Sequence, residues 1–267
     1  MNLFYNTPIH SFTSSNSSFT DCVRQYNLSS LSFSLSSFSN EAITGNYYAH
    51  KDISQTATVT TCSFNCESSI SGGAIYFTGS SSSLTITDSI FYQCNSTGGW
   101  GGGVFCDGCS KVIVQQSSFI ECFCTSSNAM AGGAMIDSST ALPEIKENSF
   151  FSCSSAQDAG GLYLYRIKGG STGVNLPMKE CIFFSCIAHG YPRGDVSDAD
   201  GGGMISWMNE YTLGISDSLF AKCESKKKAG GSFLTLNKVY FHHIVRFCFY
   251  CNNVAPNGTN TLIHFNG

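Results

Sequence analysis

The chain has 267 residues, of which 12% are charged, 42% are hydrophobic and 14 are cysteine, and its formal net charge is −4. Globular proteins carry about 25% charged residues. This composition therefore excludes a solvated helical bundle, a coiled coil and a charge-driven disordered tail. The weakly acidic balance gives no electrostatic reason to expect nucleic acid as a partner. The sequence shows no signal peptide and no apolar stretch long enough for a transmembrane helix.

Short strand patterns recur along the chain. Apolar and polar residues alternate at 31–35, 84–87, 112–114 and 213–215, which predicts half-buried strands. Such a run is followed by a polar corner and then by a short sequence motif, here called a word, in which phenylalanine precedes cysteine by three positions. This word occurs as Phe19/Cys22, Phe91/Cys94, Phe119/Cys122, Phe150/Cys153, Phe183/Cys186 and Phe220/Cys223, with degenerate copies ending at Cys66 and Cys251.

Paired glycines form a second word, each pair followed by small and then apolar residues. The pairs are Gly72-Gly73, Gly102-Gly103, Gly132-Gly133, Gly160-Gly161, Gly202-Gly203 and Gly230-Gly231. Several intervals between successive cysteine words equal 28 residues, and the 44-residue interval from Cys22 to Cys66 contains a weak copy around Gly45. A glycine pair permits positive φ, or a close backbone approach where a side chain would clash with the next coil.

These repeats predict an all-β protein, a right-handed parallel β-helix with coils of about 28–30 residues, because no segment carries a sustained helical apolar stripe. One coil cannot bury its apolar face alone, so stacking of neighbouring coils has to drive folding. We expect a single domain over 1–267 with a loop insertion at 187–200. The apolar segment 261–265 favours a fragment of a longer solenoid, or end-to-end self-association.

The words also resemble those of a known family. The combination of GGAI-type words, closest at Gly72–Ile75 and Gly132–Met135, with a Phe-x-x-Asn-like word resembles the polymorphic outer-membrane protein repeats of chlamydiae and related repeat proteins of protozoan parasites such as trichomonads. The resemblance implies a right-handed parallel β-helix on a surface-exposed or secreted protein with a role in adhesion. The chain departs from that pattern because cysteine replaces asparagine in the second word, and we expect these cysteines to pack as small hydrophobes.

The cysteines allow three interpretations. The phased cysteines are expected to form a buried ladder of free thiols, with disulfides between adjacent ladder positions as the alternative. Cys62, Cys106, Cys109, Cys124, Cys181 and Cys248 lie outside the phased positions and are the better disulfide candidates. Zinc is a weaker alternative, because four thiolates lie within 19 residues at Cys106, Cys109, Cys122 and Cys124.

The insertion at 187–200 is the most prominent candidate for an interaction loop. Tyr191, Arg193, Gly194 and Asp195 include the tripeptide Arg-Gly-Asp, which is associated with integrin recognition. Asp195, Asp198 and Asp200 are weak candidates for a calcium site. A solvated acidic loop is the simpler interpretation.

The leading functional hypothesis is a surface or secreted rod that acts in adhesion through this loop, without catalysis or a cofactor. Its expected partner is a host or neighbouring-cell surface protein or glycan. A polysaccharide-binding or polysaccharide-cleaving β-helix is the alternative. Arg166-Ile167-Lys168 is similar to a word of the polygalacturonase family, but the paired-Asp words of that family are absent. Aromatic residues and carboxylates aligned on one coil face would favour the alternative.

Overall fold

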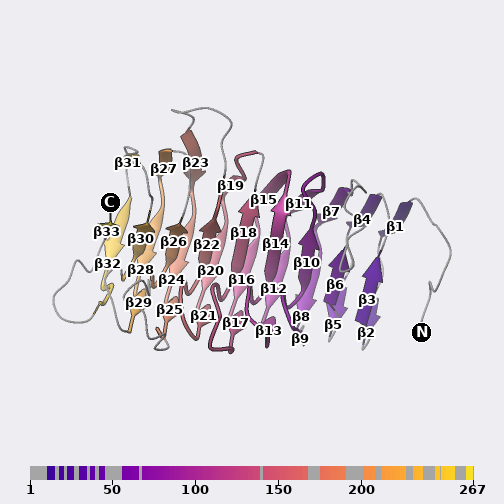
Figure 1. Ribbon diagram of the computed structural model, residues 1–267, viewed down its shortest axis with the longest axis horizontal. Helices are drawn as coiled ribbons and strands as arrows, with labels where there is room; N and C mark the ends of the chain where they lie inside the picture. Colours follow the sequence, from indigo (N-terminus) through magenta and orange to yellow (C-terminus); the bar gives the residue numbers. More distant parts are fainter. Residues whose placement is uncertain are drawn as a thin grey trace.

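The computed structural model gives an all-β chain whose parallel sheets stack as a β-solenoid, which confirms the predicted fold class (Figure 1). The described residues are 11–15, 18–20, 23–26, 30–34, 37–39, 42–45, 56–65, 68–138, 141–167, 175–190, 201–207, 212–226, 231–236, 244–246, 248–255 and 263–266. Three sheets have nine strands each and a fourth has six. Within the described ranges there is no helix, and hence none that could cross a membrane.

We name the sheets A to D. Sheet A contains β1 (Ser11–Ser15), β4 (Ser30–Ser34), β7 (Thr56–Thr60), β11 (Ser83–Thr87), β15 (Lys111–Gln115), β19 (Glu144–Lys146), β23 (Asn175–Lys179), β27 (Thr212–Ser216) and β31 (Ile244–Arg246). Sheet B contains β2 (Ser18–Thr20), β5 (Ser37–Ser39), β8 (Ser63–Asn65), β12 (Ile90–Tyr92), β16 (Ser118–Ile120), β20 (Ser149–Phe151), β24 (Ile182–Phe184), β28 (Leu219–Ala221) and β32 (Phe249–Cys251).

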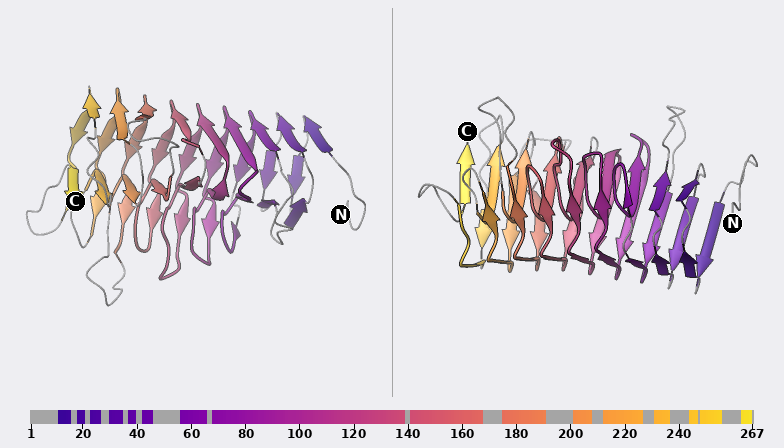
Figure 2. Two further views of the ribbon diagram at one scale, coloured as in Figure 1. Left: turned by 45° about the horizontal axis from the view of Figure 1, so that its top comes forward. Right: turned by 90° about the horizontal axis from the view of Figure 1, so that it is seen from below.

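The other two sheets complete each coil. Sheet C contains β3 (Val23–Tyr26), β6 (Ala42–Gly45), β10 (Ile75–Thr78), β14 (Val104–Cys109), β18 (Ala134–Ser138), β22 (Leu162–Tyr165), β26 (Met204–Trp207), β30 (Phe233–Leu236) and β33 (Ile263–Asn266). Sheet D contains β9 (Ser68–Ser69), β13 (Asn95–Ser96), β17 (Phe123–Cys124), β21 (Ser154–Ser155), β25 (Ile187–Ala188) and β29 (Glu224–Ser225). A full coil passes through the sheets in the order A, B, D, C. Figure 2 shows that the strands of each sheet lie side by side, one after another along the long axis of the molecule.

An aromatic stack fills the interior beside sheet B, as the phased phenylalanines predict. Phe91 and Phe119 are level in the strand register, and their ring centroids lie 4.7 Å apart with planes 5° from parallel. The stack continues in both directions at centroid distances of 4.7 to 4.9 Å through Phe64, Phe150, Phe183 and Phe220. Facing it, sheet A contributes alternating buried residues such as Leu84 and Ile86. Burial of these side chains is the main stabilising term of the solenoid.

The cysteine ladder is confirmed for the central coils. Cys94, Cys122, Cys153, Cys186 and Cys223 are buried three positions after their phenylalanines, and the last four are free thiols. They lie in the hydrophobic core, as expected of cysteines that pack as small hydrophobes, and each thiol also donates to the carbonyl of the phenylalanine one coil earlier. The Sγ–O distances run from 3.3 to 4.0 Å. The prediction of a buried ladder position is wrong for Cys251, which is exposed. Cys22 and Cys66 lie outside the described residues.

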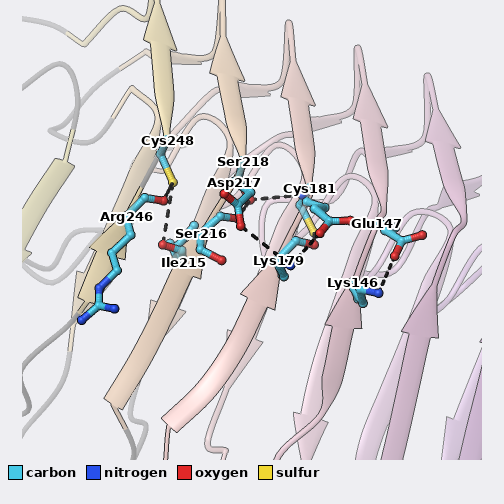
Figure 3. A network of polar contacts seen from close by, with 11 residues as sticks. Lys146, Glu147, Lys179, Cys181, Ile215, Ser216, Asp217, Ser218, Arg246 and Cys248 are labelled. Atoms are coloured by element: carbon cyan, nitrogen blue, oxygen red, sulfur yellow. Dashed lines mark hydrogen bonds and ion pairs between the residues drawn. The ribbon is translucent and has the colours of Figure 1, made fainter.

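A second ladder lies at the corner between sheets A and B, and it includes three cysteines that the sequence left unphased. Its members are Cys62, Ser89, Ser117, Asn148, Cys181, Ser218 and Cys248, two positions before each aromatic of the stack. The N–H of Cys181 donates to the Ser218 hydroxyl at 3.1 Å (Figure 3). The predicted disulfides are wrong for Cys124, Cys181 and Cys248, which are free thiols.

Twelve described residues that directly precede ladder positions adopt positive φ without being glycine, at 50 to 56°. The two columns are Thr61, Asp88, Gln116, Glu147, Glu180 and Asp217, and Gln93, Glu121, Ser152, Ser185, Lys222 and Asn252. Two members of the first column pair with lysines at the surface: Glu147 contacts Lys146 at 2.5 Å (Figure 3), and Glu180 contacts Lys179 at 2.8 Å. Exposed pairs of this kind contribute little stability. The corners therefore owe their shape mainly to the buried ladders beneath them.

The glycine words lie at the entry to sheet C, where neighbouring coils touch. A Cβ on Gly132 would lie 2.3 Å from the carbonyl oxygen of Gly160, so no side chain fits there. The strand register corrects two of the predicted glycine pairs. In the first, Gly73 and not Gly72 is level with Gly102. In the last, Gly231 and Ser232 are level with Gly202 and Gly203. These positions let the coils approach closely, as expected.

The weak copy between Cys22 and Cys66 corresponds to a coil whose described strands are β4, β5 and β6, one in each of sheets A, B and C. Phe38 in β5 is level with Phe19 and Phe64, so it continues the phenylalanine register. Gly45, around which the weak copy was expected, is the last residue of β6 and is level with Tyr26 of β3. This coil is therefore defined by its strands rather than by either word.

Candidate functional site

Variation between coils is concentrated at the two margins of sheet C. The corners on either side of sheet B are short in every full coil, whereas the connections 97–103, 125–133 and 189–203 enter sheet C and 166–174 leaves it. Loops that a rigid scaffold holds in place commonly carry binding residues. The outer face of sheet C is therefore the first surface to inspect for a site.

The outer face of sheet C carries an apolar column across five strands. Side chains alternate along β10, so Ile75 and Phe77 point into the core while Tyr76 points outward. Level with Tyr76 in the next strands are Phe105, Met135, Tyr163 and Ile205. They form a hydrophobic cluster separate from the core. At the usual strand spacing, this column is about 19 Å long.

A second outward column, two residues further along the strands, is polar at one end and aromatic at the other. Thr78 is level with Asp107, and Asp137 is level with Tyr165 and Trp207. Tyr165 and Trp207 have ring centroids 5.8 Å apart and are both half-buried. Two carboxylates thus stand beside two aromatic rings on one face.

Asp107 is presented by a bulge that a disulfide closes. Cys106 and Cys109 are bonded to each other, both side chains are buried in the core, and the register with β18 shifts between them. Asp107 and Gly108 lie between the two cysteines, and Gly108 takes a φ of 69°. Bulges commonly re-aim a side chain next to a functional site. The Cys106–Cys109 motif therefore closes the bulge that holds Asp107 on the outer face of sheet C.

The Asp107 carboxyl is partly shielded from water. Burial raises its pKa, while the positive charge of Arg166 and a hydrogen bond from the Tyr76 hydroxyl act in the opposite direction. This carboxylate is consequently close to both a cation and an aromatic hydroxyl. It has the geometry of an acceptor for hydroxyl or ammonium donors.

Asp137 and Arg166 form an ion pair on the same face. The Nε of Arg166 donates to Asp137 Oδ2 at 2.9 Å, and its Nη2 contacts the same oxygen. The Asp137 side chain is only 3% exposed, whereas that of Arg166 is 53% exposed. The guanidinium carbon also lies 4.6 Å from the centroid of the Tyr165 ring, in cation–π geometry.

Arg166 has an unusual backbone conformation. It is the one non-glycine residue with positive φ, among those described, that does not precede a ladder position. Its φ of 48° follows the end of β22, and its N–H donates to the carbonyl of Trp207 at 3.1 Å. Backbone conformations of this kind cluster at functional sites. The arginine is held by its backbone, by Asp137 and by the Tyr165 ring.

We name this surface the sheet C strip. It comprises Tyr76, Trp100, Phe105, Asp107, Asp137, Tyr165, Arg166 and Trp207. Trp100, from the connection before β14, is 38% exposed and packs edge-on against Phe105 at a centroid distance of 5.2 Å. Phe105 and Asp137 are buried. The members of the strip that a ligand can reach are the rings of Tyr76, Trp100, Tyr165 and Trp207, the Asp107 carboxylate and the exposed part of the Arg166 guanidinium.

The four cysteines proposed for zinc do not form a site. Cys106 and Cys109 are in the disulfide, Cys122 belongs to the ladder, and Cys124 donates to the carbonyl of Ala131 at 2.9 Å. Burial raises the pKa of the Cys124 thiol to about 12, which disfavours the thiolate that a metal needs. Across the described ranges, no group of three metal-binding side chains is present.

The predicted interaction loop lies outside the part of the chain that the structure describes. Tyr191, Arg193, Gly194 and Asp195, together with Asp198 and Asp200, lie outside the described residues. In the chain, this segment stands between β25 of sheet D and β26 of sheet C. Its recognition and calcium roles therefore stay predictions.

Most of the sheet C strip was missed by sequence reasoning. Arg166 was noted, but only through a word shared with another family. The signal that could have found the rest is the strand after each glycine word, whose second and fourth residues face outward. Read in the observed register, these residues are Tyr76 and Thr78, Phe105 and Asp107, Met135 and Asp137, Tyr163 and Tyr165, and Ile205 and Trp207.

Comparison with protein-family models, with curated proteins and with solved structures gave no match to this chain. The class that fold and surface define is thus a parallel β-solenoid with an aromatic and charged strip on one sheet.

Proposed function

We propose that this protein is a non-catalytic adhesion solenoid that binds a saccharide chain along the sheet C strip. The observation that carries the proposal is the joint presence of Tyr165, Trp207 and Asp107 on one face of neighbouring coils. Saccharide chains present apolar faces and many hydroxyl groups, so they suit aromatic rings flanked by a few polar groups. A repetitive, elongated surface also suits a repetitive ligand.

The resemblance to chlamydial and protozoan repeat proteins supports the adhesive part of the proposal. In that family, the solenoid is exposed at a cell surface or secreted. We accordingly place this chain at the surface or outside the cell, with a host or neighbouring-cell glycan as partner. The disulfide between Cys106 and Cys109 agrees with an oxidising environment.

Binding is a better proposal than cleavage. Glycoside hydrolysis requires two carboxyl groups that can both reach the scissile bond. Asp107 is partly accessible, but the carboxylate of Asp137 is almost fully buried and is held by two guanidinium contacts. A pair in that arrangement orients Arg166 rather than attacking a sugar.

The experiment is a glycan array probed with the purified chain and two variants. Trp207→Ala removes one ring of the strip and should abolish or strongly weaken the signals. Phe184→Ala removes a half-buried ring from the outer face of sheet B and should leave them unchanged. Equal effects of the two variants, or no glycan signal from the wild type, would contradict the proposal. No reducing-sugar release is expected from any bound glycan.

A further inference from the structure

We propose that the sheet C strip is specific for glycans without acidic groups, and that Asp107 is the residue that sets this specificity. The inference rests on the proposed function and adds the chemical class of the ligand. It depends on how the charges of the strip are distributed between buried and accessible positions.

The strip has more negative than positive charge. The sheet C strands β10, β14, β18, β22 and β26 carry Asp107 and Asp137 and contain no lysine or arginine. Arg166, which directly follows β22, supplies one positive charge against these two carboxylates. A ligand with carboxylate or sulfate groups would therefore meet a surface of like sign, which costs binding free energy.

The Arg166 side chain is 53% exposed, but its Nε and Nη2 donors are committed to Asp137 and do not serve as a receptor for acidic sugars. Its Nε and Nη2 both contact Asp137 Oδ2, and its guanidinium lies over the Tyr165 ring. A sugar carboxylate that recruited these donors would leave Asp137 buried without its cation. Breaking such a pair is strongly destabilising because it leaves an uncompensated buried charge. The ion pair thus acts as a fixed polar platform.

Asp107 is the accessible carboxylate of the strip, because Asp137 is buried. Its neighbours are the Tyr76 hydroxyl and Arg166, and it stands on a bulge fixed by the Cys106–Cys109 disulfide. An aspartate in this position accepts hydrogen bonds from sugar hydroxyls and makes stronger, charge-assisted bonds to sugar ammonium groups. Acidic glycans also carry hydroxyl donors, but the Asp107 carboxylate repels their carboxylate or sulfate groups, whereas neutral and amine-bearing glycans meet no such repulsion.

The test is calorimetric titration with oligosaccharides of equal length: an N-acetylglucosamine oligomer, a glucosamine oligomer and a galacturonate oligomer. We expect the neutral and amine forms to bind, the amine form more tightly. The galacturonate form should bind at least about tenfold more weakly than the neutral form, which corresponds to about 1.4 kcal/mol. An oligolysine peptide serves as the probe for a basic protein partner and should bind more weakly than the glycans.

Asp107→Asn tests the residue assignment. The substitution removes the charge but keeps the shape of the side chain. It should therefore abolish the preference for the amine form and reduce the difference in affinity between the neutral and galacturonate forms. Asp217→Asn makes the same chemical change on an exposed corner between sheets A and B and should change neither. Circular dichroism and the unfolding midpoint confirm that both variants are folded.

The outcomes separate the two proposals. Galacturonate binding as tight as neutral binding, or unchanged preferences in Asp107→Asn, would overturn the specificity while leaving saccharide binding in place. Binding of oligolysine above every glycan would overturn both in favour of a protein partner. No binding of any glycan by the wild type would overturn the proposed function and the specificity together.

Discussion

The side-chain amide of Asn253 takes, in its own coil, the place that the Cys223 thiol takes one coil earlier. The Asn253 Oδ1 accepts a hydrogen bond from the Cys223 N–H at 2.8 Å, and its Nδ2 donates to the Phe220 carbonyl at 2.8 Å. Cys223 donates in the same way to the carbonyl of Phe183 at 3.4 Å. The thiol therefore reproduces the donor half of an asparagine ladder, which explains how cysteine and asparagine share one position in the repeat.

This equivalence predicts the effect of placing asparagine inside the cysteine ladder. Cys153→Asn should change the free energy of unfolding by less than about 1 kcal/mol, because the amide can make both bonds seen at Asn253. Cys153→Ala should cost about 1 to 3 kcal/mol, since it leaves a small cavity and removes the donor to Phe119. Urea unfolding of both variants gives the comparison. If asparagine destabilises the chain as much as alanine does, the ladder interpretation is wrong.

The glycine column predicts a sharp contrast between two alanine substitutions. Gly132→Ala should prevent normal stacking, because the new Cβ would lie 2.3 Å from the Gly160 carbonyl oxygen and 2.6 Å from that of Ser154. Gly214→Ala, with its nearest neighbour at 3.6 Å, should be neutral or slightly stabilising because glycine weakens a strand. Thermal unfolding of each variant checks the pair, and a normal midpoint for Gly132→Ala would refute the close approach of coils.

The disulfide in β14 is predicted to support binding more than folding. The variant with Cys106→Ser and Cys109→Ser should stay folded but bind the saccharide several-fold more weakly, because the bulge that presents Asp107 is no longer closed. Cys251→Ser changes an exposed cysteine and serves as the control. Titration of both variants with the glycan found on the array measures the difference. Unchanged affinity in the double variant would show that the bulge holds its shape without the bond.

Asp107 predicts a pH dependence of stability with a defined sign. Burial raises its pKa in the folded state, so the folded chain holds that proton more tightly than the unfolded chain does. The protonated Asp107 carboxyl makes its full contribution to the free energy of unfolding in acid, below the ordinary pKa of aspartate. This contribution is lost as the pH rises through the pKa of Asp107 in the folded state. Asp107→Asn should therefore gain stability relative to wild type between acidic and neutral pH. Urea unfolding across that range measures it, and an opposite trend would contradict the shift.

The periodic part of this molecule is readable from the sequence because stacking repeats the same contact in every coil. The alternation of Leu84 and Ile86 with polar residues and the spacing of Phe91 and Phe119 are both found in the structure. Errors occur where one residue substitutes for another of different type. Asn253 replaces the expected Cys251 in the ladder, and a glycine pair shifted by one residue misplaces the first word.

The site was harder to predict because it depends on register between coils rather than on local pattern. Asp107 and Asp137 hold the same position after Gly102 and Gly132, so alignment of the glycine words brings them together, but only the strand register shows that this position lies on the outer face beside Tyr165 and Trp207. Arg166 reaches Asp137 only through a backbone conformation that the sequence does not announce. Long-range register and single unusual φ values are the information that the repeat pattern lacks.

Hydroxyl-radical footprinting with and without bound saccharide is the most direct test of the central claim. Trp100 on the strip and Tyr92 on sheet B are matched aromatic reporters, with exposures of 38% and 37%. We predict that ligand lowers the oxidation of Trp100, Tyr165 and Trp207, while Tyr92 and the 75% exposed Phe249 keep their rates. Protection of Tyr92 or Phe249, with the strip unchanged, would contradict the assignment of saccharide binding to sheet C.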